Sequence, residues 1–269
     1  LVNLKSRRGA VIVAVGSDDS VRPGQAFLPM HWGDRFLKGG VNSVTLPAFD
    51  PLSKQPELKH SGVRLESVNL PWQLFALIEG DVQRHFETLR PLCEAFSYVS
   101  LSLVGRERPA LLIRAASVAA PDPQLLGEID ECLSLIDGPV LAYDDPRRAI
   151  GKRVRIENGR ITAIRLAGET LAQHWLQGLW LEGRADEQLR RWLLAPMSAP
   201  PGNAGAQVSR DKTLCNCNNV SLNAVCGGIG QGVDLQGLKN QLGCGTQCGS
   251  CIPEIKRLLA ANVQPVAVI

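Results

Sequence analysis

Cysteine spacing carries the clearest chemistry in this chain of 269 residues. Six of its eight cysteines fall between positions 215 and 251, and four of these form the pairs Cys215-x-Cys217 and Cys248-x-x-Cys251. Four thiolates are the ligand set that a [2Fe-2S] cluster requires. Paired ligands of structural zinc are usually separated by about two to four residues, so Cys-x-Cys fits zinc poorly. We predict a [2Fe-2S] cluster on these four cysteines, with zinc, disulfides or simple core packing as alternatives.

The residues around the second pair favour a negatively charged centre. A helix is predicted over residues 252–259, because Pro253 suits the first turn of a helix. The positive end of its dipole would face the cysteines and stabilise their thiolates. Gly243, Gly245 and Gly249 allow backbone N–H groups to approach the sulfurs closely, which tunes the potential of a cluster.

Two further short helices are predicted between the cysteine pairs. They cover residues 221–230 and 234–242, and Asp234 is the expected N-cap of the second. Helical spacing places Cys226 in a small core. Cys244 stands between two glycines, so we expect it to line the loop over the cluster without binding iron.

This tail resembles a known type of iron–sulfur domain. Cys215-x-Cys217, followed by the run from Gly243 through Cys248 and Cys251 to Ile255, is similar to the bacterioferritin-associated-ferredoxin type of [2Fe-2S] domain. The resemblance implies a helical fold in which those four cysteines bind the cluster.

A second candidate site lies near the beginning of the chain. Residues 27–60 form a long irregular stretch that combines several prolines with hydrogen-bonding side chains, among them His31, Trp32, Asn42 and Lys59. A proline-stiffened loop of this kind suits ligand binding. A surface loop with local side-chain turns is the alternative.

The same stretch is similar to the C-terminal domain of the molybdopterin oxidoreductases. The resemblance is carried by Phe27-Leu28-Pro29-Met30-His31-Trp32, by Asn42-x-x-Thr45 and by Asp50-Pro51-x-Ser53-x-x-Pro56-Glu57-x-Lys59. It implies a six-stranded barrel that holds a molybdopterin guanine dinucleotide. Asn42 and Lys59 match cofactor-contacting positions, and His31 and Trp32 are further candidates. A lysine near an anionic pyrophosphate is physically reasonable.

Both ends together resemble the assimilatory nitrate reductases. That resemblance implies nitrate as the substrate, a bis-molybdopterin guanine dinucleotide with molybdenum, a cytoplasmic location, and a reductase subunit, flavodoxin or ferredoxin as the electron donor. The family's molybdenum ligand lies upstream of such a segment, so the chain is expected to be a C-terminal portion that is inactive alone. No catalytic residue is predicted within it. A standalone ferredoxin-like carrier and another molybdopterin enzyme, such as a formate dehydrogenase, are the alternatives.

Composition excludes several other classes of protein. Hydrophobic residues make up 45% and charged residues 20%, which is usual for a globular protein. No apolar run approaches the roughly 18–20 residues of a membrane helix. A net charge of +3 is too small to indicate nucleic-acid binding. Neither a membrane nor a nucleic acid is therefore an expected partner.

The helices and strands that the sequence predicts around these sites indicate an α+β protein. Strands are expected over residues 1–5 and 10–15, 42–46 and 63–68, and a hairpin is expected around Asn158-Gly159. Helices are expected over residues 124–136, 169–181 and 185–194, and Cys93 and Cys132 are expected to be buried. The predicted domains are a partial double-psi β-barrel (1–70), a mixed α/β middle region (71–195), a linker (196–211) and a small helical [2Fe-2S] domain (212–269).

Overall fold

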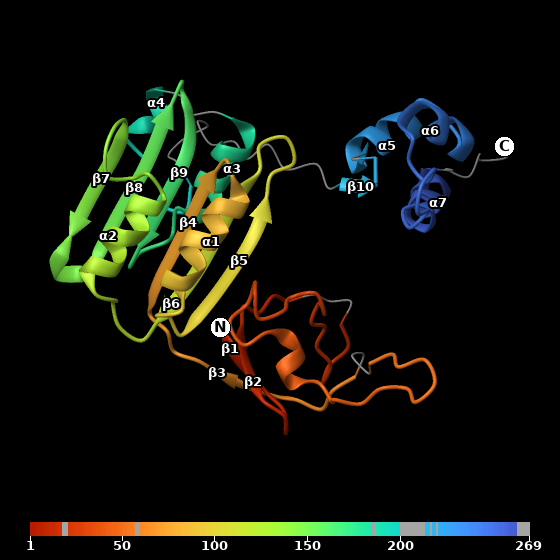
Figure 1. The fold of residues 1–269 in the computed structure, drawn as a ribbon. Coiled ribbons are helices and arrows are strands. Elements are labelled where there is room, and N and C mark those ends of the chain that lie inside the picture. Colours follow the sequence, from red (N-terminus) through yellow and green to blue (C-terminus); the bar gives the residue numbers. More distant parts are fainter. Residues whose placement is uncertain are drawn as a thin grey trace. The chain divides into compact units, whose positions relative to one another are not determined.

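The structure is a computed structural model that describes residues 1–17, 21–56, 60–183, 187–199, 213–215, 217–218 and 220–262. The chain divides into two compact units, Leu1–Gly205 and Ala206–Ile269 (Figure 1). The described part of the chain is a mixture of helices and antiparallel sheets, as predicted. None of the described helices is both long and apolar enough to cross a membrane.

The first unit begins with a three-stranded antiparallel sheet. Its order is β2-β1-β3, formed by β1 (Val2–Lys5), β2 (Ala10–Val13) and β3 (Arg64–Ser67). The predicted hairpin at the start of the chain is confirmed, because Val2 pairs with Val13 and Lys5 with Ala10. The described residues form no closed barrel.

The strand predicted over residues 42–46 is wrong. The chain forms a short 3₁₀ helix there, Val41–Val44, with Val41 and Val44 buried. Gly40 precedes it with φ of 57°, and a Cβ on Gly40 would lie 2.7 Å from the backbone nitrogen of Asp34. The tight backbone approach at this glycine overrides the β propensity of the valine and threonine side chains that follow it.

A six-stranded antiparallel sheet dominates the rest of the first unit, in the order β5-β6-β4-β9-β8-β7. Its strands are β4 (Trp72–Glu79), β5 (Tyr98–Val104), β6 (Ala110–Ser117), β7 (Val140–Asp145), β8 (Ile150–Glu157) and β9 (Arg160–Ala167). The predicted hairpin at Asn158-Gly159 is confirmed as β8–β9, and both turn residues have positive φ, 51° and 71°. Such angles give a turn whose twist matches that of the strands.

Helices cover both faces of this sheet. On one face, α1 (Val82–Cys93) and α2 (Pro123–Cys132) bury Phe86, Leu89 and Ile129 against alternate residues of β4, β5 and β6 (Figure 1). On the other face, α3 (Gln173–Glu182) buries Leu176 and Trp180 against Phe75 and Leu77 of β4. The predicted last helix of this region is reduced to α4 (Glu187–Arg190). Strand β4 is buried on both faces from Leu74 to Ile78, and this stretch is accordingly a continuous apolar run.

The core of the middle region also contains a buried ion pair. Arg165 of β9 and Asp130 of α2 are 3% and 4% exposed. The guanidinium donates two hydrogen bonds to the carboxylate, one of them 2.8 Å long from Nε to Oδ1. A second ion pair joins the buried Lys152 to the half-buried Glu169. Arg165 packs so closely over Gly151 that a Cβ there would lie 2.6 Å from its Nη1 atom.

The second unit is a small helical domain with a two-stranded sheet. It contains β10 (Thr213–Cys215), β11 (Val220–Ser221), α5 (Leu222–Gly230), α6 (Leu235–Leu242) and α7 (Ile252–Asn262). Asp234 is the N-cap of α6, as predicted, and accepts a hydrogen bond of 2.8 Å from the Gly237 N–H. Most of the predicted linker, from residue 200 onward, lies outside the described residues.

Candidate metal centre and cofactor segment

The structure places the four predicted cysteine ligands in two pairs in the second unit. Cys215 ends β10, Cys217 lies in the turn that follows, and Cys248 and Cys251 lie in the turn before α7. The Sγ atoms of Cys217 and Cys248 are 3.3 Å apart. Cys215 and Cys251 are hydrogen-bonded to each other through their side chains. Each pair therefore contains one thiol from each sequence motif.

The two pairs differ in exposure. Cys215 and Cys251 are 3% and 5% exposed, whereas Cys217 and Cys248 are exposed to solvent. One pair is therefore inside the small core of the domain and the other is on its surface. The sequence spacing predicted the four residues but not this cross-pairing, because pairing depends on how the two loops fold against each other.

Backbone and hydroxyl donors surround these sulfurs. The Gly245 N–H donates to the sulfur of Cys215 and lowers the pKa of that thiol, and it also donates to Cys251, whose pKa burial raises. The hydroxyl of Ser250 lies 3.1 Å from the Cys248 sulfur and lowers the pKa of that thiol to about 7. Donors of this kind stabilise sulfur in its anionic, metal-binding form.

Gly245 is a point at which a single methyl group should disturb the site. Its φ is 75°, and a Cβ there would lie 2.9 Å from Cγ1 of Ile252 at the start of α7. We expect Gly245→Ala to strain the backbone that donates to two sulfurs, and to lower the amount of cluster retained by about 10–100-fold, as loss of an outer-shell contact does. Iron and sulfide analysis would measure this. Gly230→Ala, where a Cβ would contact nothing within 4 Å, is the matched control and should retain the cluster.

Asn218 is a residue that sequence reasoning missed. Its side-chain amide donates to the backbone oxygen of Gly243 and, over 3.1 Å, to the hydroxyl of Thr246. It therefore ties the loop after Cys217 to the loop before Cys248. Its position directly after the first cysteine motif is the signal that could have identified it.

The other two cysteines of the tail lie outside the pairs. Cys226 is exposed on α5, so the prediction that it lies in a small core is wrong; Val225 occupies that core instead. Cys244 is buried, its thiol lies 3.5 Å from the Leu238 oxygen, and burial raises its pKa. In the first unit, Cys93 is buried as predicted and its pKa is raised to about 12, whereas Cys132 is only half-buried.

Two thiol pairs fit a binuclear cluster, because each iron of a [2Fe-2S] cluster with four cysteine ligands takes two thiolates. Within the described residues, no three or more His, Cys, Asp or Glu side chains are gathered closely enough to hold one metal ion. The fit therefore rests on the two pairs and on the N–H groups directed at them.

The candidate cofactor residues of the first unit lie close together along one loop. His31 is exposed, Trp32 is half-buried against the core that contains Leu4 and Val11, and Asn42 is exposed in the 3₁₀ helix. The backbone oxygen of Trp32 accepts a hydrogen bond of 2.8 Å from the Val41 N–H, which places the His31-Trp32 segment beside Asn42. Lys59 lies outside the described residues.

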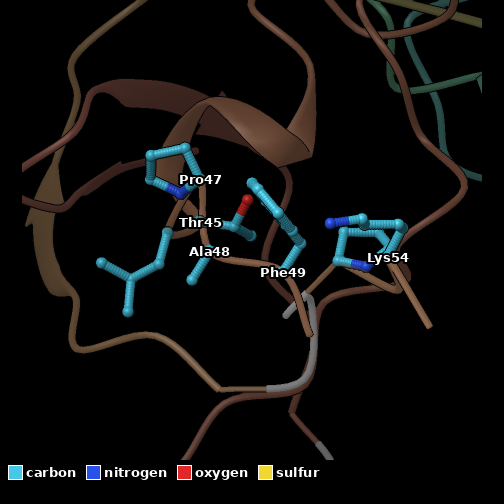
Figure 2. A pocket seen from close by; sticks show the side chains of 7 residues that line it. Thr45, Pro47, Ala48, Phe49 and Lys54 are labelled. Carbon is cyan, nitrogen blue, oxygen red and sulfur yellow. The ribbon is translucent and has the colours of Figure 1, made fainter. Parts of the chain in front are cut away.

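An open cavity of about 510 Å³ follows directly after these residues (Figure 2). It is lined mainly by apolar side chains, including Leu46, Pro47 and Phe49, and by Lys54. The ammonium group of Lys54 lies 5.5 Å from the centre of the Phe49 ring. Lys54 is therefore a cation at this cavity, which the sequence did not single out.

Local turns account for part of the polar composition of the same segment. Asp50 Oδ1 accepts hydrogen bonds from the Leu52 and Ser53 N–H groups and from the Ser53 hydroxyl, at 3.0, 2.7 and 3.0 Å. These contacts, led by the Ser53 N–H, lower the pKa of Asp50. Asp50 and Ser53 therefore shape the loop, as the surface-loop alternative requires.

Comparison with known proteins assigns both ends of the chain to families. Residues 1–62 match the family described as "Molydopterin dinucleotide binding domain", and residues 213–261 match the "BFD-like [2Fe-2S] binding domain". The chain carries both domains. Its cofactors are accordingly a molybdopterin dinucleotide and a [2Fe-2S] cluster, as predicted.

Two proteins named nitrate reductase are similar to this chain. The first, from Klebsiella oxytoca, is 27% identical over 282 aligned positions, which cover 98% of this chain and 28% of that protein. The second, from Synechocystis sp., is 45% identical over 67 positions, which cover 24% of this chain and 9% of that protein. The chain thus spans less than a third of the length of these relatives. No solved structure matches it.

Proposed function

We propose that this chain is the C-terminal part of a molybdopterin oxidoreductase that reduces nitrate to nitrite in nitrate assimilation. The observation that carries the proposal is the presence of both cofactor domains in one chain that is similar, over 98% of its length, to a nitrate reductase. The [2Fe-2S] domain relays electrons from a donor toward molybdenum. When bound, the cluster supplies one-electron transfer, and the molybdenum cofactor supplies the two-electron reduction of nitrate.

Cys215, Cys217, Cys248 and Cys251 are the proposed ligands of the cluster. Their support is the pairing of thiols from two loops and the donors around them. The pairs Cys215/Cys251 and Cys217/Cys248 each provide the two thiolates of one iron. Because Cys217 and Cys248 are exposed, their side of the domain is the proposed contact for the electron donor, a reductase subunit, flavodoxin or ferredoxin.

Asn42, Lys59, His31 and Trp32 are the proposed contacts to the molybdopterin dinucleotide. The family match over residues 1–62 and the closeness of Trp32 to Val41 support this set. Residues 1–70 are one domain in this proposal, and they contribute their strands to a double-psi barrel that other parts of the native protein complete. The site is shared with those parts, so the 269-residue chain alone is inactive and holds no catalytic residue.

The alternatives make different predictions for one experiment. The native protein, which we propose to be cytoplasmic, is purified anaerobically and supplied with a reduced viologen dye and either nitrate or carbon dioxide. The proposal expects nitrite formation that disappears when cells are grown with tungsten in place of molybdenum. Formate formation without nitrite would indicate a formate dehydrogenase. Neither product, together with a [2Fe-2S] cluster and no pterin, would indicate a standalone electron carrier.

Lys59 provides a separate test of the cofactor contacts. Removing one charge-assisted hydrogen bond to a phosphate costs roughly 1.5–3 kcal/mol, so Lys59→Ala is expected to leave the native protein with partial pterin occupancy and an intact [2Fe-2S] signal. Pterin content, measured after oxidation to a fluorescent derivative, is the readout. Lys5→Ala is the control, because Lys5 is paired with Glu66 at the surface of the same domain. Equal pterin content in both variants would contradict the assignment.

A further inference from the structure

The candidate cofactor residues stand at the two ends of one closed loop, residues 33–40. The Trp32–Val41 hydrogen bond of 2.8 Å closes the neck of this loop. Inside it, the Gly33 oxygen accepts from the Phe36 and Leu37 N–H groups at 2.9 and 3.0 Å. His31 and Trp32 directly precede the loop and Asn42 follows its end, so any movement of the loop changes how these residues face one another.

The loop is attached to the six-stranded sheet by backbone hydrogen bonds. Leu37 forms an antiparallel bridge with Ser100 of β5, the strand at one edge of the six-stranded sheet. The Lys38 N–H donates to the Val99 oxygen over 3.0 Å, and the Leu101 N–H donates to the Phe36 oxygen over 2.7 Å. Residues 36–38 are therefore attached to the edge of the sheet through one isolated β-bridge and its flanking hydrogen bonds.

Two cationic side chains attach the same loop to helix α1, one from the helix and one from the loop. Arg90 of α1 donates to the backbone oxygens of Asp34 and Arg35, at 3.1 and 3.2 Å. From the loop, the ammonium group of Lys38 donates to the backbone oxygens of Glu94 and Phe96, at 2.6 and 2.9 Å. Glu94 is the C-cap of α1 and Phe96 lies just beyond it. A cation at a helix C-terminus is favoured by both hydrogen bonding and the helix dipole.

Aromatic contacts complete the attachment. The ring centres of Phe36 and Phe86 are 5.5 Å apart and the rings are tilted by 58°, which is within contact distance for an aromatic pair. The guanidinium of Arg35 lies 4.8 Å from the centre of the Phe86 ring. Leu37 is buried in the same core as Tyr98 of β5, so the two parts of the first unit share a core here.

We propose that the region formed by β4 to β9 positions the molybdopterin-contacting segments at the two ends of the loop, because it holds residues 34–38 against α1 and β5. Neither family match extends into this region. This inference rests on the proposed cofactor contacts at His31, Trp32 and Asn42. Arg90 acts through the loop and is a positioning residue: it fixes the backbone between the two contact segments. All of the contacts that hold the loop are made within the protein, so the proposed cofactor contacts are preorganised.

The test uses the native, cofactor-loaded protein with the substitution Arg90→Ala. Removing its two hydrogen bonds is expected to speed hydrogen exchange at Phe36, Leu37 and Val41 by about tenfold, equivalent to about 1.4 kcal/mol. Pterin content should fall, and the Mo(V) electron paramagnetic resonance signal should become heterogeneous. Arg84→Ala, an exposed arginine on the same helix, is the control and should change none of these readouts. Arg90→Lys should restore part of the lost protection.

The outcomes separate the inference from the function on which it depends. Unchanged exchange over residues 34–41 in Arg90→Ala would overturn the attachment itself. Faster exchange with normal pterin content and an unaltered Mo(V) signal would show that the loop is held for a reason unrelated to the cofactor, and would also overturn the inference. A native protein that contains no pterin at all would overturn the proposed function instead.

Discussion

Replacing Cys215 by serine is expected to remove the [2Fe-2S] cluster from the native protein. Cys215 is buried beside Cys251, and a neutral hydroxyl there is a much poorer ligand than a thiolate supported by the Gly245 N–H. Serine at Cys217, Cys248 or Cys251 should have the same effect. The loss should exceed the roughly 10–100-fold weakening that follows removal of an outer-shell contact. Iron, sulfide and zinc analysis, together with electron paramagnetic resonance of the reduced protein, measures it.

The remaining two cysteines of the tail supply matched controls. Cys226 is exposed on α5, so Cys226→Ser should leave the spectrum unchanged. Cys244 is buried next to the pairs, so Cys244→Ser should retain the cluster with a shifted reduction potential. The ligand set would be wrong if Cys244→Ser lost the cluster while Cys215→Ser kept it, or if the purified protein contained stoichiometric zinc and no sulfide.

The second large effect is expected in the middle region, where Asp130→Ala should lower the free energy of unfolding of the first unit by about 3–5 kcal/mol. The change leaves the guanidinium of Arg165 buried without its counter-ion. Its Nη1 atom already has no hydrogen-bond partner among the described residues. All five tryptophans, at positions 32, 72, 175, 180 and 192, belong to the first unit, so urea unfolding followed by tryptophan fluorescence reports on this unit alone.

A surface aspartate of the same region is the control for this prediction. Asp144 pairs with Arg153 over 2.8 Å, but its side chain is 52% exposed. Asp144→Ala should therefore cost less than about 1 kcal/mol. Replacing Asp130 and Arg165 together by apolar residues should recover most of the lost stability, because no buried charge is left unpaired. A small effect of Asp130→Ala alone would show that water reaches Arg165.

The sequence predicted the turns and caps that depend on neighbouring residues. It missed the elements that depend on packing against distant parts of the chain. The hairpin at Asn158-Gly159 and the cap at Asp234 depend on one or two residues, and both are present. Helix α1 was not predicted. Its mean composition is polar, it carries Pro91 near its end, and its stability comes from packing Phe86 and Leu89 on the sheet.

The same distinction applies to the candidate sites. Cysteine spacing is a local property, so the four candidate ligands could be named, but Cys226 was misplaced because helical spacing alone leaves open which residue of a turn faces the core. The contacts of residues 34–38 with α1 and β5 join positions more than 50 residues apart in sequence. No local pattern marks such contacts, so they could be found only in the folded chain.

A cluster bound by both thiol pairs would act as a covalent cross-link. Among the described residues of the second unit, three of the eight that are buried in its core are themselves cysteines, which leaves few apolar side chains there to stabilise this domain. Because each pair joins one end of segment 215–251 to the other, a cluster closes a loop of more than 30 residues and restricts the unfolded chain, by about 3–4 kcal/mol on the scale of a disulfide. Loss of iron would then release helices α5 and α6 together, so that oxidative damage to the cluster becomes an unfolding event of the whole domain.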